Sequence, residues 1–346
     1  MAGSVRVGII GATGYGGGEL VRLLSRHPAA EIVGLQARGR TDEAIELSHP
    51  HLGTTALRIG EALPEELDAV FLGLPHGAAA ALVPELVAKG VTVIDLGPDF
   101  RLHDPADYPR WYRFDHPNAE LLQRAVYGLP ELHRDELAKL RDADARIVAS
   151  PGCYATASIL SLAPLAMAGL LDDVVVDAKS GVSGAGREAK PEMHFSEVNE
   201  SVKAYGVGGH RHVAEIEQEL GALAETQLGP VDFLPHLIPM TRGILAACHV
   251  RTTRPVEQAE LDALYHSAYD DEAFVEVVAA PPATKHVTGS NLFKVHPRSD
   301  PRTGRVLVLG VLDNLVKGAA GQAIQAFNLV FGLPERSGLE QLPLAP

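Results

Sequence analysis

Val5-Arg-Val-Gly-Ile-Ile10 runs directly into Gly11-Ala-Thr-Gly-Tyr-Gly-Gly-Gly18, and this stretch decides the fold. The first run is short, apolar and rich in β-branched residues, which predicts a buried strand. After the glycines, residues 19–27 carry leucines at helical spacing, and residues 31–36 have the pattern of a second strand. Strand, glycine-rich turn, helix and strand predict a βαβ unit at the start of a parallel sheet.

The glycines form G-x-x-G-x-x-G, a variant of the dinucleotide-binding fingerprint. Because glycine lacks a Cβ atom, such a loop turns tightly and lets a pyrophosphate approach the amides at the start of the helix. The alternative is tight strand–helix packing without a ligand. The cofactor-binding residues predicted from this loop are Gly11, Thr13, Gly14, Tyr15, Gly16 and Gly17.

The residues after the second strand indicate which dinucleotide binds. An NAD site usually places an acidic residue there for the ribose hydroxyls. Here the stretch is Gln36-Ala-Arg-Gly-Arg40, with no acidic residue before Asp42. Arg38 and Arg40 suit a 2′-phosphate, so we expect NADP(H). The alternative is two solvated surface arginines.

Further strand and helix patterns divide the chain. Apolar strands at 69–74, 91–96 and 146–150 extend the first pattern, so residues 1–150 predict a Rossmann-type doubly wound parallel sheet. The helical stretch at 78–88 should be interrupted or kinked at Pro84. Residues 151–316 predict a second α+β domain with a largely antiparallel mixed sheet. We expect a buried helix at 155–171, strands at 173–179, 246–252, 274–279 and 306–312, a hairpin turn at 299–304 and a last helix at 317–329.

Composition excludes several classes of protein. The 346 residues suggest two or three domains, and a net charge of −14 argues against nucleic acid or an anionic membrane as partner. Hydrophobic content of 46% excludes disorder for most of the chain, and two cysteines exclude a disulfide scaffold. With no targeting segment and no clean run of ~20 apolar residues, we expect a cytoplasmic protein.

A cysteine follows the strand at 146–150, in Ser150-Pro-Gly-Cys-Tyr154. The free amides and positive dipole end of the helix that follows would stabilise a thiolate at Cys153 and an oxyanion beside it. This is the chemistry of an acyl-enzyme nucleophile. The alternative, a buried and inert cysteine, fits Cys248 in its apolar run much better.

Paired histidines occur in His49-Pro-His51 and His210-Arg-His212. Neither pair lies near further ligands in a known metal-binding pattern, so we expect no metal site. The second pair precedes an amphipathic helix, and a histidine there could exchange protons opposite Cys153. The alternative is a capping or surface histidine.

Two loops are candidates for contact with the substrate. Arg101 lies just beyond the carboxyl end of the strand at 91–96, where ligands bind in such folds, and it could hold an anionic group. Residues 180–187 are small and end in Arg187, so this loop could face a phosphate or the nicotinamide. The alternatives are a solvated arginine and a flexible connector.

Over nearly its whole length the chain resembles the N-acetyl-γ-glutamyl-phosphate reductases, a family of arginine biosynthesis that is similar to the aspartate-semialdehyde dehydrogenases. The resemblance rests on motifs in family order: the glycine loop, Leu74-Pro-His-Gly77, Asp99-Phe-Arg101, Tyr127-Gly-Leu-Pro-Glu131, Pro151-Gly-Cys-Tyr154, Ser180 to Arg187, His210-Arg-His212, Arg242-Gly-Ile244, Gly289-Ser-Asn291 and Asp313-Asn-Leu-Val-Lys-Gly318.

The resemblance implies NADPH-dependent reduction of N-acetylglutamyl phosphate to the semialdehyde through a thioester on Cys153. Either His210 or His212 is the implied acid/base; we favour His212, which immediately precedes the helix. It also implies a homo-oligomer, a dimer or tetramer, and a last segment, about 317–346, that returns to the nucleotide domain with Asn314 near the cofactor. The remaining implied contacts are Pro75 and Gly184 for the cofactor and Arg101, Ser183 and Arg187 for the substrate.

Three other functions would each require different features in the sequence. A reductase of carrier-protein-linked glutamyl or aminoadipyl phosphate should carry a basic docking surface for its acidic carrier, which the charge of −14 disfavours. A short-chain dehydrogenase would need Tyr-x-x-x-Lys, and none of the eight tyrosines has a lysine four residues on. A non-catalytic NADP-binding regulator would keep the glycine loop but need no activated cysteine.

Overall fold

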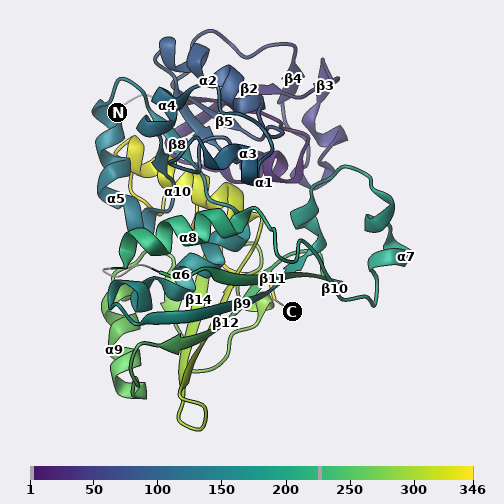
Figure 1. Cartoon of the computed structure of the whole chain (residues 1–346). Helices are drawn as coiled ribbons and strands as arrows, with labels where there is room; N and C mark the ends of the chain where they lie inside the picture. The colour runs from purple at the N-terminus through teal and green to yellow at the C-terminus, as the bar shows by residue number, and fades with distance from the viewer. Residues whose placement is uncertain (1–3, 225–227, 346) are drawn as a thin grey trace. The chain divides into compact units, whose positions relative to one another are not determined.

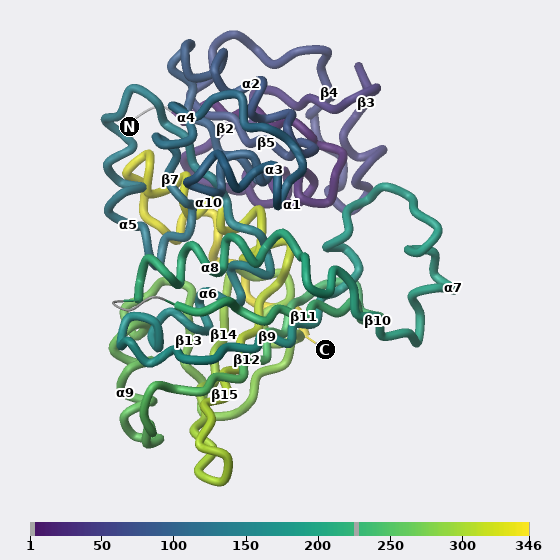
Figure 2. The backbone as a smooth tube through the Cα atoms, viewed as in Figure 1, coloured from purple at the N-terminus to yellow at the C-terminus, as the bar shows by residue number. Residues whose placement is uncertain are grey.

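The computed structural model describes residues 4–224 and 228–345 and divides into two compact units (Figures 1 and 2). Unit 1 comprises the chain up to Pro151 together with Ala319–Glu340, and unit 2 comprises Gly152–Gly318 with the last few residues. Within the described residues, no helix is long and apolar enough to cross a membrane.

Among the residues described, unit 1 forms one sheet in the order β3-β4-β2-β1-β5-β6-β8-β7. All neighbouring strands are parallel except β3 and β4. The strands are β1 (Val5–Ile10), β2 (Ala30–Gln36), β3 (Glu43–Ala44), β4 (Arg58–Gly60), β5 (Ala69–Leu72), β6 (Thr92–Asp95), β7 (Val126–Tyr127) and β8 (Ile147–Ala149). The predicted Rossmann-type sheet is confirmed.

The helices of unit 1 bury apolar faces, and hydrogen bonds between polar side chains also hold them in place. They are α1 (Tyr15–Leu24), α2 (Ala78–Ala88), α3 (Asp107–Trp111), α4 (Ala119–Arg124), α5 (Pro130–Lys139) and α10 (Gly321–Val330). Helix α2 runs through Pro84 without ending there, so of the two expected effects of this proline the interruption is absent. Helix α10 is fixed to α5 because the Gln325 amide donates to Glu131 (2.9 Å) and to Glu335 (2.8 Å).

Unit 2 contains a mixed sheet, whose described strands lie in the order β10-β11-β9-β12-β15-β14-β13. β9 is parallel to β11 and β13 to β14, and the other pairs are antiparallel. The strands are β9 (Leu171–Gly181), β10 (Lys203–Ala204), β11 (Val231–Ile238), β12 (Ile244–Thr252), β13 (Val275–Val277), β14 (Phe293–Asp300) and β15 (Arg305–Leu312). The largely antiparallel second sheet is therefore confirmed, and β14 and β15 form the predicted hairpin.

Helices cover one face of this sheet (Figure 1). Helix α6 (Cys153–Met167) packs across β12 and β15, α8 (His212–Leu223) packs on β11, and α9 (Gln258–Tyr269) packs on β13 and β14. The strand residues beneath them, such as Cys248 and Val308, are fully or almost fully buried. Alternate residues point to the opposite face, where Ala247 pairs with Leu309 and both are only half-buried.

The structure differs from the expected elements at the end of α6 and at β11. Helix α6 starts at Cys153 and ends at Met167, and Leu171, which we placed in that helix, begins β9. Strand β11 was not expected, because Pro235 interrupts its apolar pattern and lacks the amide hydrogen that a sheet uses. Pro235 instead accepts a hydrogen bond through its carbonyl, from the Tyr205 amide (3.1 Å).

Candidate active site

Cys153 is the first residue of α6, and the residue before it controls its surroundings. Gly152 caps the helix with an extended backbone that any residue could adopt. A Cβ at Gly152, however, would lie 2.3 Å from the Nε2 atom of His212. Gly318 is equally close on another side, since its Cβ would lie 2.7 Å from the Cβ of Cys153. Two missing side chains therefore make room for the cysteine and the imidazole.

A buried carboxylate connects the residue before Cys153 to the surroundings of His212. Glu215 is fully buried in the first turn of α8, and its Oε2 atom accepts a hydrogen bond from the Gly152 amide (2.9 Å). Its Oε1 atom lies 3.9 Å from the Nε2 atom of His212. A buried negative charge at this distance stabilises the imidazolium form of a histidine that takes up a proton. Glu215 was not predicted from the sequence, because its position in the chain matches the spacing of a solvated residue on an amphipathic helix.

His210 occupies an aromatic box beside His212. Its ring centroid lies 4.7 Å from His212, 5.7 Å from Tyr154 and 5.6 Å from Tyr205. Burial, with a smaller effect of the Arg211 charge, lowers the pKa of His210 to about 4. The imidazole is therefore neutral near pH 7, and its Nδ1 atom accepts the His212 amide hydrogen at 3.3 Å.

These groups line a cavity of about 380 Å³ in unit 2. Cys153, His210, His212 and the predicted Gly184 all contribute to its wall. Five further lining residues were not predicted from the sequence. They are the cations Lys190, Lys203 and Arg211, the carboxylate Glu192 and the aromatic residue Tyr205. Four of them lie between the small-residue loop and the paired histidines, in a segment that carries no recognisable motif, and Arg211 lies between the two histidines.

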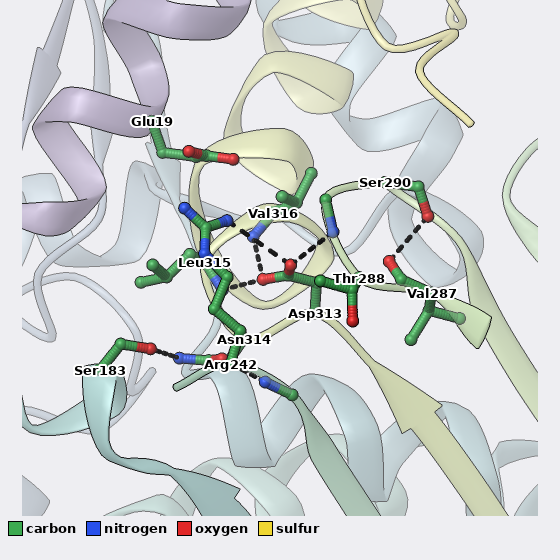
Figure 3. Close-up of polar contacts among 12 residues, drawn as sticks. Glu19, Ser183, Arg242, Val287, Thr288, Ser290, Asp313, Asn314, Leu315 and Val316 are labelled. Atoms are coloured by element: carbon green, nitrogen blue, oxygen red, sulfur yellow. Dashed lines mark hydrogen bonds and ion pairs between the residues drawn. The ribbon is translucent and has the colours of Figure 1, made fainter. Parts of the chain in front are cut away.

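Ser183 and Asn314, two other predicted site residues, bind each other (Figure 3). The Asn314 amide donates to the Ser183 hydroxyl (3.0 Å), and its oxygen accepts the Gly243 amide hydrogen (2.7 Å). The next residue back, Asp313, accepts amide hydrogens from Gly289 and Leu315. These bonds fix the small-residue loop to the end of β15. Arg187 is exposed and, as far as the structure is described, lies outside the cavity wall.

The glycine loop of unit 1 joins β1 to α1 as predicted. Gly11 has a φ of +88°, and a Cβ there would lie 2.2 Å from the Gly73 carbonyl oxygen. Gly17 is equally restricted, by the Gly11 carbonyl oxygen at 2.3 Å. Gly14 and Gly16, by contrast, have no atom closer than 3.4 Å to such a Cβ. Packing explains the first two glycines, while the other two leave backbone open to a ligand, which fits a dinucleotide.

Neighbouring segments of unit 1 support this loop. The His49 ring lies against Gly18, and its Nε2 atom is 2.9 Å from the Ala12 carbonyl oxygen. His49 therefore supports the glycine loop, and the described residues contain no group of three or more potential metal ligands. Pro75 follows β5, and the next turn is held by Asp99, which accepts the amide hydrogens of Gly77 and Ala80.

Three predicted arginines of unit 1 have different surroundings. Arg101 is 7% exposed and donates to the carbonyl oxygens of Ser150 (2.7 Å) and Leu96 (2.9 Å). Arg40 is exposed and forms an ion pair with Glu43 (3.0 Å). Arg38 is exposed at the tip of the tight turn after β2, with no ion pair to any residue that the structure describes.

Two family models match the two units. The model for the NAD binding domain of semialdehyde dehydrogenases matches residues 6–140, and the model for their dimerisation domain matches residues 153–314. An aspartate semialdehyde dehydrogenase II from Vibrio cholerae, solved with ASA, has the same fold, with a TM-score of 0.72, 19% identity and coverage of 96% of this chain and 99% of that one. The class defined by the fold is that of the semialdehyde dehydrogenases.

Closer relatives narrow the class. An N-acetyl-gamma-glutamyl-phosphate reductase of Desulforudis audaxviator is 50% identical over 97% of this chain and 98% of its own. That of Symbiobacterium thermophilum is 50% identical over 97% of both chains. The chain belongs to the N-acetyl-gamma-glutamyl-phosphate reductase family, as the resemblance of its motifs predicted, and it is an oxidoreductase.

The two cysteines should differ sharply in reactivity. Cys248 is almost fully buried, and burial raises its pKa to about 12, so it stays a protonated thiol near neutral pH. Cys153 is half-buried and begins a helix. We expect iodoacetamide to alkylate Cys153 in the folded protein and to leave Cys248 unmodified, as read by mass spectrometry of peptides. Modification of both in denaturant is the control, and preferential labelling of Cys248 in the folded chain would contradict the assignment.

Proposed function

We propose that this protein reduces N-acetyl-L-glutamyl 5-phosphate to N-acetyl-L-glutamate 5-semialdehyde with NADPH, in arginine biosynthesis. The observation that carries the proposal is a half-buried cysteine at a helix start, beside a buried His–Glu pair, in a cavity rich in cations. The names of relatives that match over the full length support the substrate.

The proposed reaction begins at Cys153. Its thiolate attacks the acyl carbon, a C–S bond forms, and the C–O bond to phosphate breaks, which leaves a thioester. The amides and the positive dipole end at the start of α6 would stabilise the oxyanions that form beside the sulfur. When bound, the dinucleotide supplies the hydride that reduces the thioester carbon. Expulsion of the cysteine sulfur then releases the aldehyde.

His212 is the proposed proton carrier. Its Nε2 atom lies over Gly152, next to Cys153, and near the buried Glu215 carboxylate. His210 is held neutral in its aromatic box and is proposed to position His212 through the latter's amide. Asn314 and Ser183 are proposed to hold the small-residue loop toward the substrate and cofactor, with Gly184 on the cavity wall.

The dinucleotide is proposed to bind on the backbone of Gly14 and Gly16 at the start of α1, with Thr13, Tyr15 and Pro75 around it. Arg38 is the proposed partner of the 2′-phosphate, because Arg40 already pairs with Glu43. An aspartate semialdehyde dehydrogenase of Candida albicans that has the same fold (TM-score 0.65, 17% identity, 95% of this chain and 98% of that one) was solved with NADP. Arg101 and Arg187 remain proposed contacts of the substrate phosphate.

The first test is the reverse reaction. N-acetylglutamate semialdehyde, phosphate and NADP⁺ should yield NADPH, and the Cys153→Ser variant should yield none. His212→Asn should lower kcat about 10²- to 10⁴-fold, the usual contribution of a general acid/base, while His210→Asn should have a much smaller effect. Activity of the wild type only on a carrier-linked substrate would instead favour the related carrier-dependent reductases.

Replacing Arg38 tests the proposed cofactor. Loss of a charge-assisted contact to the 2′-phosphate should raise the KM for NADPH by about 10- to 100-fold in Arg38→Ala. The KM for NADH should not change, because NADH has no 2′-phosphate. Arg40→Ala is the matched control, and equal effects of Arg38→Ala on both cofactors would exclude a role in choosing between them.

We propose a homo-oligomer that forms through the sheet face of unit 2 opposite its helices. Half-buried Leu234, Ala247 and Leu309 lie in one cross-strand row on that face, in which Asp177 stands between Leu234 and Ala247. The matching family model describes a dimerisation domain. Light scattering should give a multiple of the chain mass, and Leu309→Glu should shift it to the monomer. Lys139→Glu, on an exposed helix of unit 1, should leave the mass unchanged; a monomeric wild type would contradict the proposal.

A further inference from the structure

The cavity around Cys153 has a local charge opposite to that of the whole chain. The chain carries a net charge of −14, yet the cations Lys190, Lys203 and Arg211 face the cavity together with one carboxylate, Glu192. All four come from one segment of unit 2, which leads from the small-residue loop to the start of α8. Positive charge in a concave wall attracts and retains anions. This segment is therefore the part of the cavity suited to read the charges of a substrate.

Lys203 has a fixed backbone position in this segment. It lies in β10, which runs beside β11 (Figure 1), where Lys203 pairs with Leu237 and Ala204 with His236. The hydrogen bond from the Tyr205 amide to the Pro235 carbonyl extends the pairing. Side chains two residues apart on a strand point to the same face, and Lys203 and Tyr205 both line the cavity.

The ammonium group of Lys203 is not neutralised by the protein. Within the part of the chain that the structure describes, Lys203 forms no ion pair, whereas Lys190 lies 4.0 Å from a Glu188 oxygen. Lys179, on the neighbouring strand β9, pairs with Asp177 at 2.6 Å. Lys203 is thus the lysine of this cavity with its charge available to a ligand.

The separation between Lys203 and Tyr205 along the chain indicates which group of the substrate Lys203 contacts. Tyr205 belongs to the aromatic box, with its ring 5.6 Å from His210, and so lies close to the reacting groups. Lys203 is two residues further along the strand, about 7 Å at the usual rise per residue. The phosphate of the proposed substrate is attached to the carbon that Cys153 attacks, while the free carboxylate lies at the other end of the carbon chain. Lys203 is therefore placed for the carboxylate.

We propose that Lys203 binds the α-carboxylate of the substrate and so restricts the enzyme to acyl phosphates that carry an acidic group at the far end. The inference rests on the proposed function, since the carboxylate belongs to the substrate named there. It gives Lys203 a role in specificity that is separate from the chemistry at Cys153.

The reverse reaction tests this assignment because phosphate and semialdehyde enter it as separate substrates. Lys203→Met should raise the KM for N-acetylglutamate semialdehyde about 10- to 100-fold and leave the KM for phosphate unchanged. The α-methyl ester of the semialdehyde, which lacks the charge, should be used equally well by wild type and variant. The preference of the wild type for the acid over the ester should therefore disappear in Lys203→Met.

Two further variants and the ester distinguish a failure of the Lys203 assignment from a failure of the proposed function. Lys190→Met should have a smaller effect, because Glu188 already balances its charge, and Lys139→Met on exposed α5 should have none. A retained preference for the acid in Lys203→Met, or a selective rise in the KM for phosphate, would overturn the assignment while the proposed function stands. A wild type that is inactive with acid and ester alike would overturn both. An unchanged thermal unfolding midpoint shows that each variant is folded.

Discussion

The hydrogen bond from the Gly152 amide to the buried Glu215 carboxylate is the contact on which the arrangement of Cys153 and His212 in unit 2 depends. It joins the residue before Cys153 to the first turn of α8, so the start of α6 and the histidine that begins α8 cannot move independently. A buried carboxylate is costly unless it is hydrogen-bonded, and the same group that meets this requirement lies near the His212 ring. One side chain thus links the turn before Cys153 to the surroundings of the His212 ring.

Missing side chains matter here as much as those that are present. Gly152 and Gly318 approach His212 and Cys153 so closely that a single methyl group would collide with each. Neither glycine has a positive φ, so conformational freedom does not explain them. In the glycine loop of unit 1 the cause differs between positions: Gly11 is required by both its φ and its packing, whereas Gly14 and Gly16 leave backbone exposed. A glycine motif therefore combines residues that serve the fold with residues that serve a ligand.

This difference explains what the sequence could predict. The strand, turn and helix around the glycine loop, and the cysteine at the start of α6, are local features whose residues are neighbours in the chain, so pattern and spacing reveal them. Glu215 could not be found in this way, because a buried carboxylate has the same spacing in a helix as a solvated one. Lys203 and Tyr205 were missed because their role comes from the pairing of β10 with β11, and Pro235 hides that strand from any periodicity argument. Long-range pairing, and not local propensity, decides those positions.

The net charge of the chain and the local charge of the cavity wall also act over different distances. A net charge of −14 predicts repulsion of an anionic substrate at long range, and ions in solution screen this repulsion beyond roughly 8 Å at physiological ionic strength. Inside the cavity the nearest charges are those of the wall, where cations outnumber carboxylates. An acidic protein can therefore bind a polyanion, provided that one short segment places its cations on the same side. Changes in the charges of Lys190, Glu192 and Lys203 can therefore alter which substrate is held without altering the bond from the Gly152 amide to Glu215.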